Sequence, residues 1–171
     1  MKVNVVESVL SANDSVAKRN RSIMEEAGVL AINMMSAPGS GKTTLLQKTM
    51  DDFADDYRSA VLVGDLQTTR DAERLNDGAV EVTQINTGRG CHLSATQVCD
   101  GLASLRLDRI DFLFIENVGN LVCPASFSLG EHKRVVLLSV PEGDDKIAKY
   151  PTMFQPADVI VLTKVDLLSV L

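Results

Sequence analysis

Apolar and polar residues alternate along this chain in two different periods. Short runs of mainly apolar residues, the pattern expected of strands in a parallel sheet, recur between longer segments with helical spacing. A further run alternates apolar and polar side chains, which predicts a strand nearer the sheet edge. Strands that alternate with helices predict an α/β fold with a mostly parallel sheet flanked by helices. The apolar runs are residues 29–35, 59–63, 110–115, 135–140 and 159–162, and the alternating run is 80–86.

The first 28 residues read as an N-terminal helical extension, and residues 29–171 as the main domain. Val9, Val16 and Ile23, with Leu10, Met24 and Ala27 beside them, recur at helical spacing and predict the apolar face, whereas polar residues such as Asn13 fall mostly between them. Gly28 is placed to end this helix. We expect it to be a packing helix. Further helices are predicted after residue 44, over 69–75 and 94–105, and before residue 153.

Length and charge narrow the class of protein. A chain of 171 residues is enough for one domain with a substantial core. The net charge of −6, with both signs interspersed, argues against a nucleic-acid or anionic-membrane surface. The chain shows neither a membrane-spanning run nor a signal-peptide pattern, so we expect a cytoplasmic protein. Three widely spaced cysteines do not form a disulfide framework and are expected to be free thiols, buried or metal-bound.

The segment S-A-P-G-S-G-K-T-T, residues 36–44, joins the first apolar strand to a helix and is called the phosphate loop below. Glycines let backbone N–H groups converge on a phosphate chain, and the helix N-terminus adds positive charge. Lys42 is expected to reach the β- and γ-phosphates, and the Thr43 hydroxyl to bind Mg²⁺. The alternative is a glycine-rich turn without a ligand. The predicted nucleotide-binding residues are Pro38, Gly39, Ser40, Gly41, Lys42, Thr43 and Thr44.

Two carboxylates end predicted strands where ligands of parallel sheets bind. Asp65 follows 59–63 and is a candidate to bind Mg²⁺ or orient water; alternatively it caps the following helix. Glu116 begins E-N-V-G, a D-x-x-G form with Glu in place of Asp, in which the Gly119 N–H is predicted to contact the γ-phosphate. Together with Lys42, these carboxylates are the predicted catalytic residues, and together with Thr43 they are the predicted magnesium site.

Sulfur and imidazole ligands follow two of the strands. Cys91 and His92 lie in the glycine-flanked loop T-G-R-G-C-H-L, and Cys123 follows Glu116 closely. Thiolate and imidazole groups suit a soft or borderline ion such as Ni²⁺ or Zn²⁺, which predicts a three-ligand metal site. The alternative is a buried cysteine beside a surface histidine.

The last apolar strand ends in T-K-V-D, residues 163–166, called the base motif below. It matches the [NT]-K-x-D guanine motif. The Asp166 carboxylate is predicted to accept from the N1–H and N2–H₂ of guanine, while the Lys164 stem packs on the base and Thr163 opens the motif. Adenine presents no such donor pair, so a site of this kind can favour guanine strongly. The alternative is a solvated turn.

The ordered motifs S-A-P-G-S-G-K-T-T, G-D-L-Q-T-T-R-D, T-G-R-G-C-H-L, E-N-V-G-N-L-V-C-P and T-K-V-D-L-L closely resemble the hydrogenase nickel-incorporation GTPases, the HypB family. The resemblance runs from about residue 9 to the end. It implies a three-layer P-loop NTPase sandwich of the SIMIBI type that binds GTP or GDP with Mg²⁺. It also implies a further strand, a second base-contacting loop and a helix after Leu171, so that the G domain lacks its expected C-terminal end.

The same resemblance implies a function. Cys91, His92 and Cys123 would bind nickel or zinc at an interface between two subunits, and GTP would favour the homodimer. The protein would work with a nickel metallochaperone and serve the hydrogenase large subunit precursor in maturation of [NiFe] hydrogenase. GTP hydrolysis would be slow and switch-like, as in small GTPases that lack an arginine finger.

Three alternatives predict different chemistry. The urease accessory GTPases have a similar nucleotide site, but a resemblance to them would predict the sequence Cys-Pro-His at the metal loop. Here Cys123-Pro124 is followed by Ala125 instead. A nucleotide-independent metal-binding or scaffold protein would bind nickel without GTP. A plain GTPase switch would keep its cysteines only as core residues.

Overall fold

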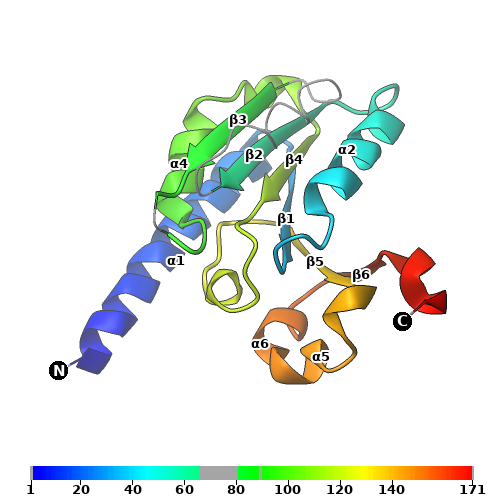
Figure 1. Ribbon diagram of the computed structural model, residues 1–171. Coiled ribbons are helices and arrows are strands. Elements are labelled where there is room, and N and C mark those ends of the chain that lie inside the picture. Colours follow the sequence, from blue (N-terminus) through cyan, green and yellow to red (C-terminus); the bar gives the residue numbers. More distant parts are fainter. Residues whose placement is uncertain (1, 66–80, 89, 171) are drawn as a thin grey trace.

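The computed structural model describes residues 2–65, 81–88 and 90–170, with side chains from residue 10 onward except that of Asp65. Six strands form one sheet in the order β3-β2-β4-β1-β5-β6 (Figure 1). Every pairing in it is parallel, which confirms the α/β prediction. The strands are β1 (Leu30–Ser36), β2 (Ser59–Asp65), β3 (Glu81–Asn86), β4 (Phe112–Glu116), β5 (Lys133–Ser139) and β6 (Val159–Thr163).

Helices cover both faces of the sheet (Figure 1). The α-helices are α1 (Lys2–Glu26), α2 (Lys42–Phe53), α4 (Ala95–Ala103), α5 (Lys146–Lys149) and α6 (Pro151–Phe154). Short 3₁₀ turns are η1 (Leu107–Arg109), η2 (Cys123–Ser126), η3 (Val140–Glu142) and η4 (Val165–Ser169). The predicted helix over 69–75 lies outside the described residues. Within the described residues, the helices are too short or too polar to cross a membrane.

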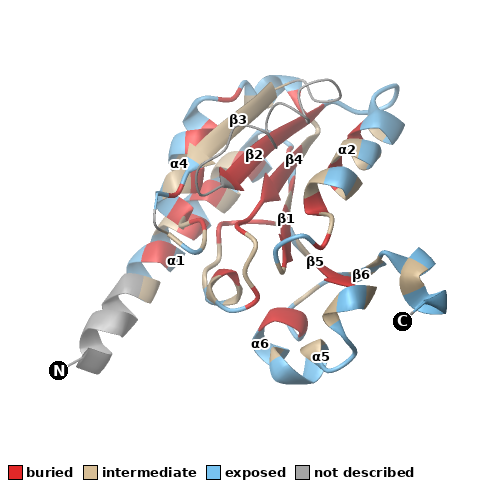
Figure 2. Cartoon of the chain, viewed as in Figure 1, coloured by how far each residue is buried: buried red, intermediate tan, exposed pale blue. Residues whose placement is uncertain are grey.

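Alternate residues of each strand supply the two sides of the core. In β2, Leu62 packs in a cluster with residues of α1 and α4, whereas Val61 packs in a second cluster with residues of α2. A third cluster joins β5 to α6. The sheet centre is therefore buried, as expected of a parallel sheet covered on both faces (Figure 2).

The two sheet edges differ in burial. The alternating strand β3 lies at one edge and is half-buried, as its pattern predicts. β6 lies at the other edge, where Val159, Ile160 and Leu162 remain 45–50% exposed. Apolar composition alone does not distinguish such a strand from a central one.

Helix α1 ends as predicted, because Gly28 follows it in a left-handed conformation with φ of 73°. The predicted apolar face is confirmed in part. Met24 is fully buried as expected, but Val16 and Ile23 are only half-buried and Ala27 is exposed. The residues that face the domain are Asn13, Ala17, Asn20 and Met24, of which Asn20 and Met24 are fully buried. Two asparagines thus replace apolar residues on the buried face, and their partners are described below.

Candidate functional site

The predicted site residues lie at the end of the sheet where the strands finish. Because all strands are parallel, their carboxyl ends share this side of the sheet, where ligands of such sheets bind (Figure 1). The phosphate loop follows β1, the Cys91 loop follows β3, and the base motif follows β6. Glu116 is the last residue of β4. Asp65 is the last residue of β2, so its backbone lies at the same carboxyl end of the sheet.

The phosphate loop turns sharply into α2. Gly39 and Gly41 have φ of 74° and 95°, a conformation that side chains with a Cβ rarely adopt. α2 begins at Lys42, so its unpaired N–H groups and positive end face the loop. Gly119, predicted to contact the γ-phosphate, lies against this loop, since a Cβ on it would be 3.0 Å from the Pro38 Cα.

Two side-chain contacts order the loop. Lys42 is 8% exposed, and its ammonium donates to the Ser36 hydroxyl at 2.9 Å. The Thr43 hydroxyl donates to Glu116 Oε1 at 2.7 Å, although the two residues lie on different elements. A hydroxyl and a buried carboxylate side by side are oxygen donors of the kind Mg²⁺ prefers. These two predicted magnesium ligands fit the ion; the third, Asp65, has its side chain outside the description.

Glu142, which the sequence analysis missed, holds the phosphate loop from the other side. Its Oε1 accepts from the Ser40 hydroxyl at 2.7 Å, and from the hydroxyl and N–H of Ser139 at 2.7 and 2.9 Å. Burial pushes the pKa of Glu142 upward, but these hydrogen bonds outweigh it and hold that pKa below its ordinary value. The signal was weak, because a carboxylate in the P-E-G-D-D run resembles a solvated turn.

The base motif contacts the same loop. The Thr163 hydroxyl donates to the Ser40 carbonyl at 2.7 Å, which connects the end of β6 to the phosphate loop. Lys164 has φ of 56°. Among the described residues, it is the non-glycine residue with a positive φ. Lys164 and Asp166 are exposed, as expected of groups that receive a base from solvent.

The three predicted metal ligands converge. The ligand atoms of Cys91, His92 and Cys123 all lie within 4.8 Å of one another. Cys91 Sγ is 3.6 Å from His92 Nδ1, and the His92 ring stacks on Phe127 with ring centroids 3.9 Å apart. The two cysteines come from loops after different strands, so the tertiary fold brings them together. Two sulfurs and one imidazole suit zinc or nickel and leave room for a further ligand. The third cysteine, Cys99, is half-buried on α4.

The protonation of these groups follows from their contacts. The hydrogen bond with Cys123 raises the pKa of the Cys91 thiol, and burial adds to the rise. Burial lowers the pKa of His92 and favours the neutral imidazole, the form that binds a metal. The cysteines must lose their protons to bind an ion, so metal binding competes with acid.

Asn117, also missed by the sequence analysis, connects the nucleotide side to the metal side. It directly follows Glu116 and is 1% exposed. Its Oδ1 accepts from the N–H of Leu93, the residue after His92, at 3.1 Å. Its Nδ2 donates to Asn33 Oδ1 on β1 at 3.3 Å. A displacement of Glu116 would therefore move Asn117, and with it the backbone of Leu93 next to His92.

Comparison with known proteins agrees with these features. The family described as CobW/HypB/UreG, nucleotide-binding domain, matches residues 30–171. The chain is 47% identical over 165 residues to the probable hydrogenase maturation factor HypB of Methanocaldococcus jannaschii, covering 96% of this chain and 75% of that protein. It is 50% identical over 163 residues to the hydrogenase maturation factor HypB of Escherichia coli, covering 95% of this chain and 56% of that protein.

Solved structures show the same relationship in three dimensions. The crystal structure of HypB from Helicobacter pylori in complex with nickel has a TM-score of 0.88 at 48% identity, and the match covers 93% of this chain and 75% of that one. FtsY from Mycoplasma mycoides, with a TM-score of 0.59, 20% identity and coverage of 80% and 53%, shows the shared fold alone. The SIMIBI-type P-loop fold expected from the sequence is confirmed, and the chain belongs to the HypB family of hydrogenase maturation factors.

Proposed function

We propose that this protein binds GTP with Mg²⁺, hydrolyses it slowly to GDP and phosphate, and uses the nucleotide state to control a nickel site in maturation of [NiFe] hydrogenase. The observation that carries the proposal is the convergence of Cys91, His92 and Cys123 at the same end of the sheet as the phosphate loop. Nickel is the cargo here. The nickel complex of the H. pylori relative supports nickel over zinc.

The residues divide the nucleotide between them. The phosphate-loop amides and Lys42 hold the phosphates, and Asp166 selects guanine. Thr43, Glu116 and Asp65 supply oxygens to Mg²⁺, which neutralises charge on the phosphates when bound. Glu116 or Asp65 also orients the attacking water, and Gly119 donates its N–H to the γ-phosphate. Catalysis thus rests on positioning and charge, as in other phosphoryl-transfer sites.

Nucleotide state reaches the metal by two routes. One is the chain between Glu116 and Cys123. The other is the hydrogen bond from the Leu93 N–H to Asn117, which connects the neighbour of Glu116 to the neighbour of His92. Loss of the γ-phosphate would shift Glu116 and Gly119, and with them the separation of the ligands. GTP favours a homodimer, and metal release to the hydrogenase large subunit precursor follows hydrolysis, with a nickel metallochaperone as partner.

The test is a nickel titration of the purified chain with GDP and with a non-hydrolysable GTP analogue. Absorbance from thiolate to metal and the oligomer mass are followed together. We expect nickel affinity or stoichiometry to differ between the two nucleotides. Cys123→Ala should abolish the thiolate band, whereas the matched control Cys99→Ala should keep it.

Two outcomes contradict the proposal. Nickel binding that ignores the nucleotide would identify a nucleotide-independent metal-binding protein. Nucleotide binding without any thiolate-to-nickel absorbance would identify a plain GTPase switch with core cysteines.

A further inference from the structure

Helix α1 makes side-chain hydrogen bonds to both segments that carry the metal ligands. Asn13 Oδ1 accepts from the Ala95 N–H at 2.9 Å, and Asn13 Nδ2 donates to the Ser128 carbonyl at 2.8 Å. Asn20 Nδ2 donates to the carbonyls of Ala95 at 2.8 Å and Leu129 at 3.0 Å. Each amide therefore bridges the first residue of α4 to the segment after η2.

These anchor points lie close to the ligands. Ala95 is three residues after His92, and Ser128 is five residues after Cys123. Phe127, next to Ser128, stacks on the His92 ring. The bridges thus fix the position of the Cys91-His92 loop relative to the Cys123 segment. They connect the two halves of the site through α1, in addition to the direct hydrogen bond from Asn120 Nδ2 to the Cys91 carbonyl at 3.3 Å.

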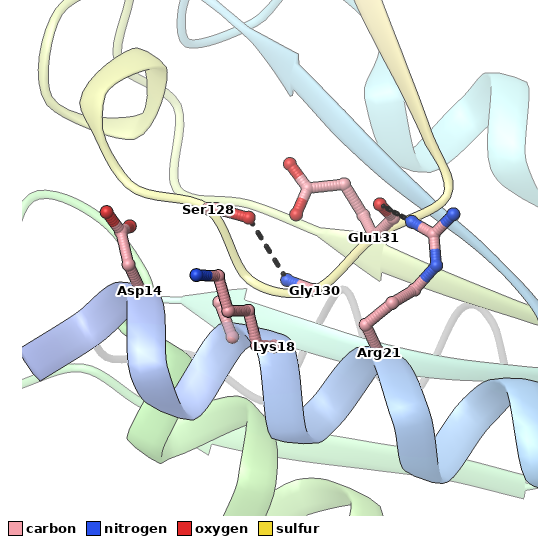
Figure 3. A pocket seen from close by; sticks show the side chains of 7 residues that line it. Asp14, Lys18, Arg21, Ser128, Gly130 and Glu131 are labelled. Atoms are coloured by element: carbon pink, nitrogen blue, oxygen red, sulfur yellow. Dashed lines mark hydrogen bonds between the residues drawn. The ribbon is translucent and has the colours of Figure 1, made fainter. Parts of the chain in front are cut away.

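Close contact between backbones supports the bridges. Gly130 has φ of 96°, and a Cβ on it would lie 2.5 Å from the Ala17 carbonyl oxygen. Arg21 donates to the Glu131 carbonyl at 2.6 Å. Figure 3 shows α1 facing this segment across a pocket, with Arg21 directed at Glu131 and Lys18 and Asp14 along the rim. The segment after Cys123 is therefore held against α1 over several residues.

The choice of asparagine at two buried positions needs a reason. A buried amide is costly unless hydrogen-bonded, and an apolar residue would pack the same helix face without that cost. Asn13 and Asn20 are seven residues apart and so share one face. Among the described residues, their side-chain hydrogen bonds all end on the two segments that carry the predicted metal ligands. Packing alone does not require this pattern.

We propose that Asn13 and Asn20 are positioning residues of the metal site, through which α1 sets the separation between the Cys91-His92 loop and Cys123. The inference rests on the proposed nickel function and adds a role for α1 to it. Groups that orient metal ligands from outside the ligand set typically affect metal affinity by 10-fold to 100-fold. We expect a loss of about that size when either bridge is broken.

Two substitutions break the bridges with little change in shape. Asn13→Asp keeps an oxygen toward the Ala95 N–H but sets a second oxygen against the Ser128 carbonyl. Asn20→Asp removes both donated bonds. Met50→Ala in α2 is the matched control, because Met50 is fully buried in the cluster on the other face of the sheet and its loss lowers stability without touching α1.

Nickel affinity, the wavelength of the thiolate-to-nickel band and GDP affinity are measured for each variant. The proposal predicts weaker nickel binding and a shifted band in both Asn variants, with GDP affinity unchanged within about 2-fold and nickel binding unchanged in Met50→Ala. If the Asn variants lose thermal stability but bind nickel like the parent, their role is only structural and the proposal is wrong.

A second readout does not depend on nickel. Phenylarsine oxide bridges two thiols that lie close together, so formation of its one-to-one adduct reports the separation of Cys91 and Cys123. Slower adduct formation in the Asn variants than in the parent and in Met50→Ala supports the positioning role, even if the parent fails to bind nickel and the proposed function falls. Equal rates in all chains would overturn it. Asn13→Asp, the milder change, provides this test if Asn20→Asp does not fold.

Discussion

The phosphate loop and the base motif stand at two ends of one predicted nucleotide site, but the protein holds them differently. The phosphate loop leaves the central strand β1 and is tied by side chains to β4 and η3 through Glu116 and Glu142. The base motif follows the edge strand β6. Within the described residues, the hydrogen bond from the Thr163 hydroxyl to the Ser40 carbonyl connects the base motif to the phosphate loop. Lys164 and Asp166 are exposed.

The difference indicates that the phosphate loop is held in place before a ligand binds, whereas the base motif is left open to solvent. A phosphate chain needs several converging donors, and these must be held in place before the ligand arrives. A base needs a few hydrogen bonds and a surface to pack on, which an exposed edge can provide. We therefore expect substitutions at the phosphate end to affect binding and stability together, and substitutions at the base end to affect mainly specificity.

The largest expected effect is that of Lys42→Ala on nucleotide affinity. Removing one partner of a buried, charge-assisted interaction costs about 2–5 kcal/mol, so GTP and GDP affinity should fall roughly 30-fold or more. Fluorescence titration with a labelled GDP measures it. The control is Lys48→Ala, whose side chain is exposed on the same helix and pairs with Asp52. A similar loss in both variants would remove the distinction.

The next effect compares neighbouring strands. Leu138 on β5 and Leu162 on β6 are register partners, but Leu138 is 7% exposed and Leu162 is 50% exposed. We expect Leu138→Ala to lower the free energy of unfolding by about 2–5 kcal/mol. Leu162→Ala should lower it by less than about 1 kcal/mol, because less apolar area is buried. Urea denaturation measures both. Equal losses would show that β6 is covered in solution.

Asp166→Ala tests the base end directly. Loss of hydrogen bonds to a charged acceptor costs about 1.5–3 kcal/mol, which corresponds to roughly 10-fold to 100-fold in GDP affinity. Binding of ADP should stay as weak as in the parent, and thermal stability should not change, since Asp166 is exposed. Competition titrations with GDP and ADP measure the ratio. An unchanged ratio would mean that these residues do not select guanine.

The smallest effect is the pH dependence that Glu142 adds at the phosphate end. Since its pKa is lowered on folding, it stabilises the protein at neutral pH, and this contribution is lost as the pH falls below its ordinary value of 4.5. Glu142→Gln should therefore be slightly less stable near pH 7 and show a flatter loss of stability in acid. Thermal melts from pH 7 down to about pH 3, a range that extends below the ordinary pKa, measure it, with Asp144→Asn, at an exposed residue of the same turn, as the control. Parallel curves for parent and Glu142→Gln would contradict the assignment.

Much of the fold was predictable because its signals are local. Apolar runs separated by helical segments indicated the parallel sheet, and the alternating pattern of residues 81–86 placed β3 at an edge. The phosphate loop was recognisable because left-handed turns at Gly39 and Gly41 need residues without a Cβ. The metal ligands could be named from their chemistry, but not shown to meet.

Other features depend on strand order, which the sequence does not state. Glu142 reaches Ser40 because β5 lies next to β1. Asn117 reaches Leu93 because the loops after β3 and β4 lie at the same carboxyl end of the sheet. The apolar face of α1 was predicted only in part, for a related reason. Periodicity counts an asparagine as polar and places it outside, whereas Asn13 and Asn20 are buried and form hydrogen bonds to backbone groups far away in the chain.

The sequence by itself predicted the kinds of chemistry proposed for this protein: a loop for phosphates, a motif for guanine, and two thiols with an imidazole for a soft or borderline ion. Each of these rests on residue type and short spacing, which act over a few neighbouring residues. Only the tertiary structure decided that Cys91 and Cys123 meet, that β6 lies at the outer edge beside β5, and that α1 forms hydrogen bonds to both segments that carry the predicted metal ligands. Those outcomes depend on contacts between residues far apart in the chain, and such contacts form only when the strands take their places in the sheet.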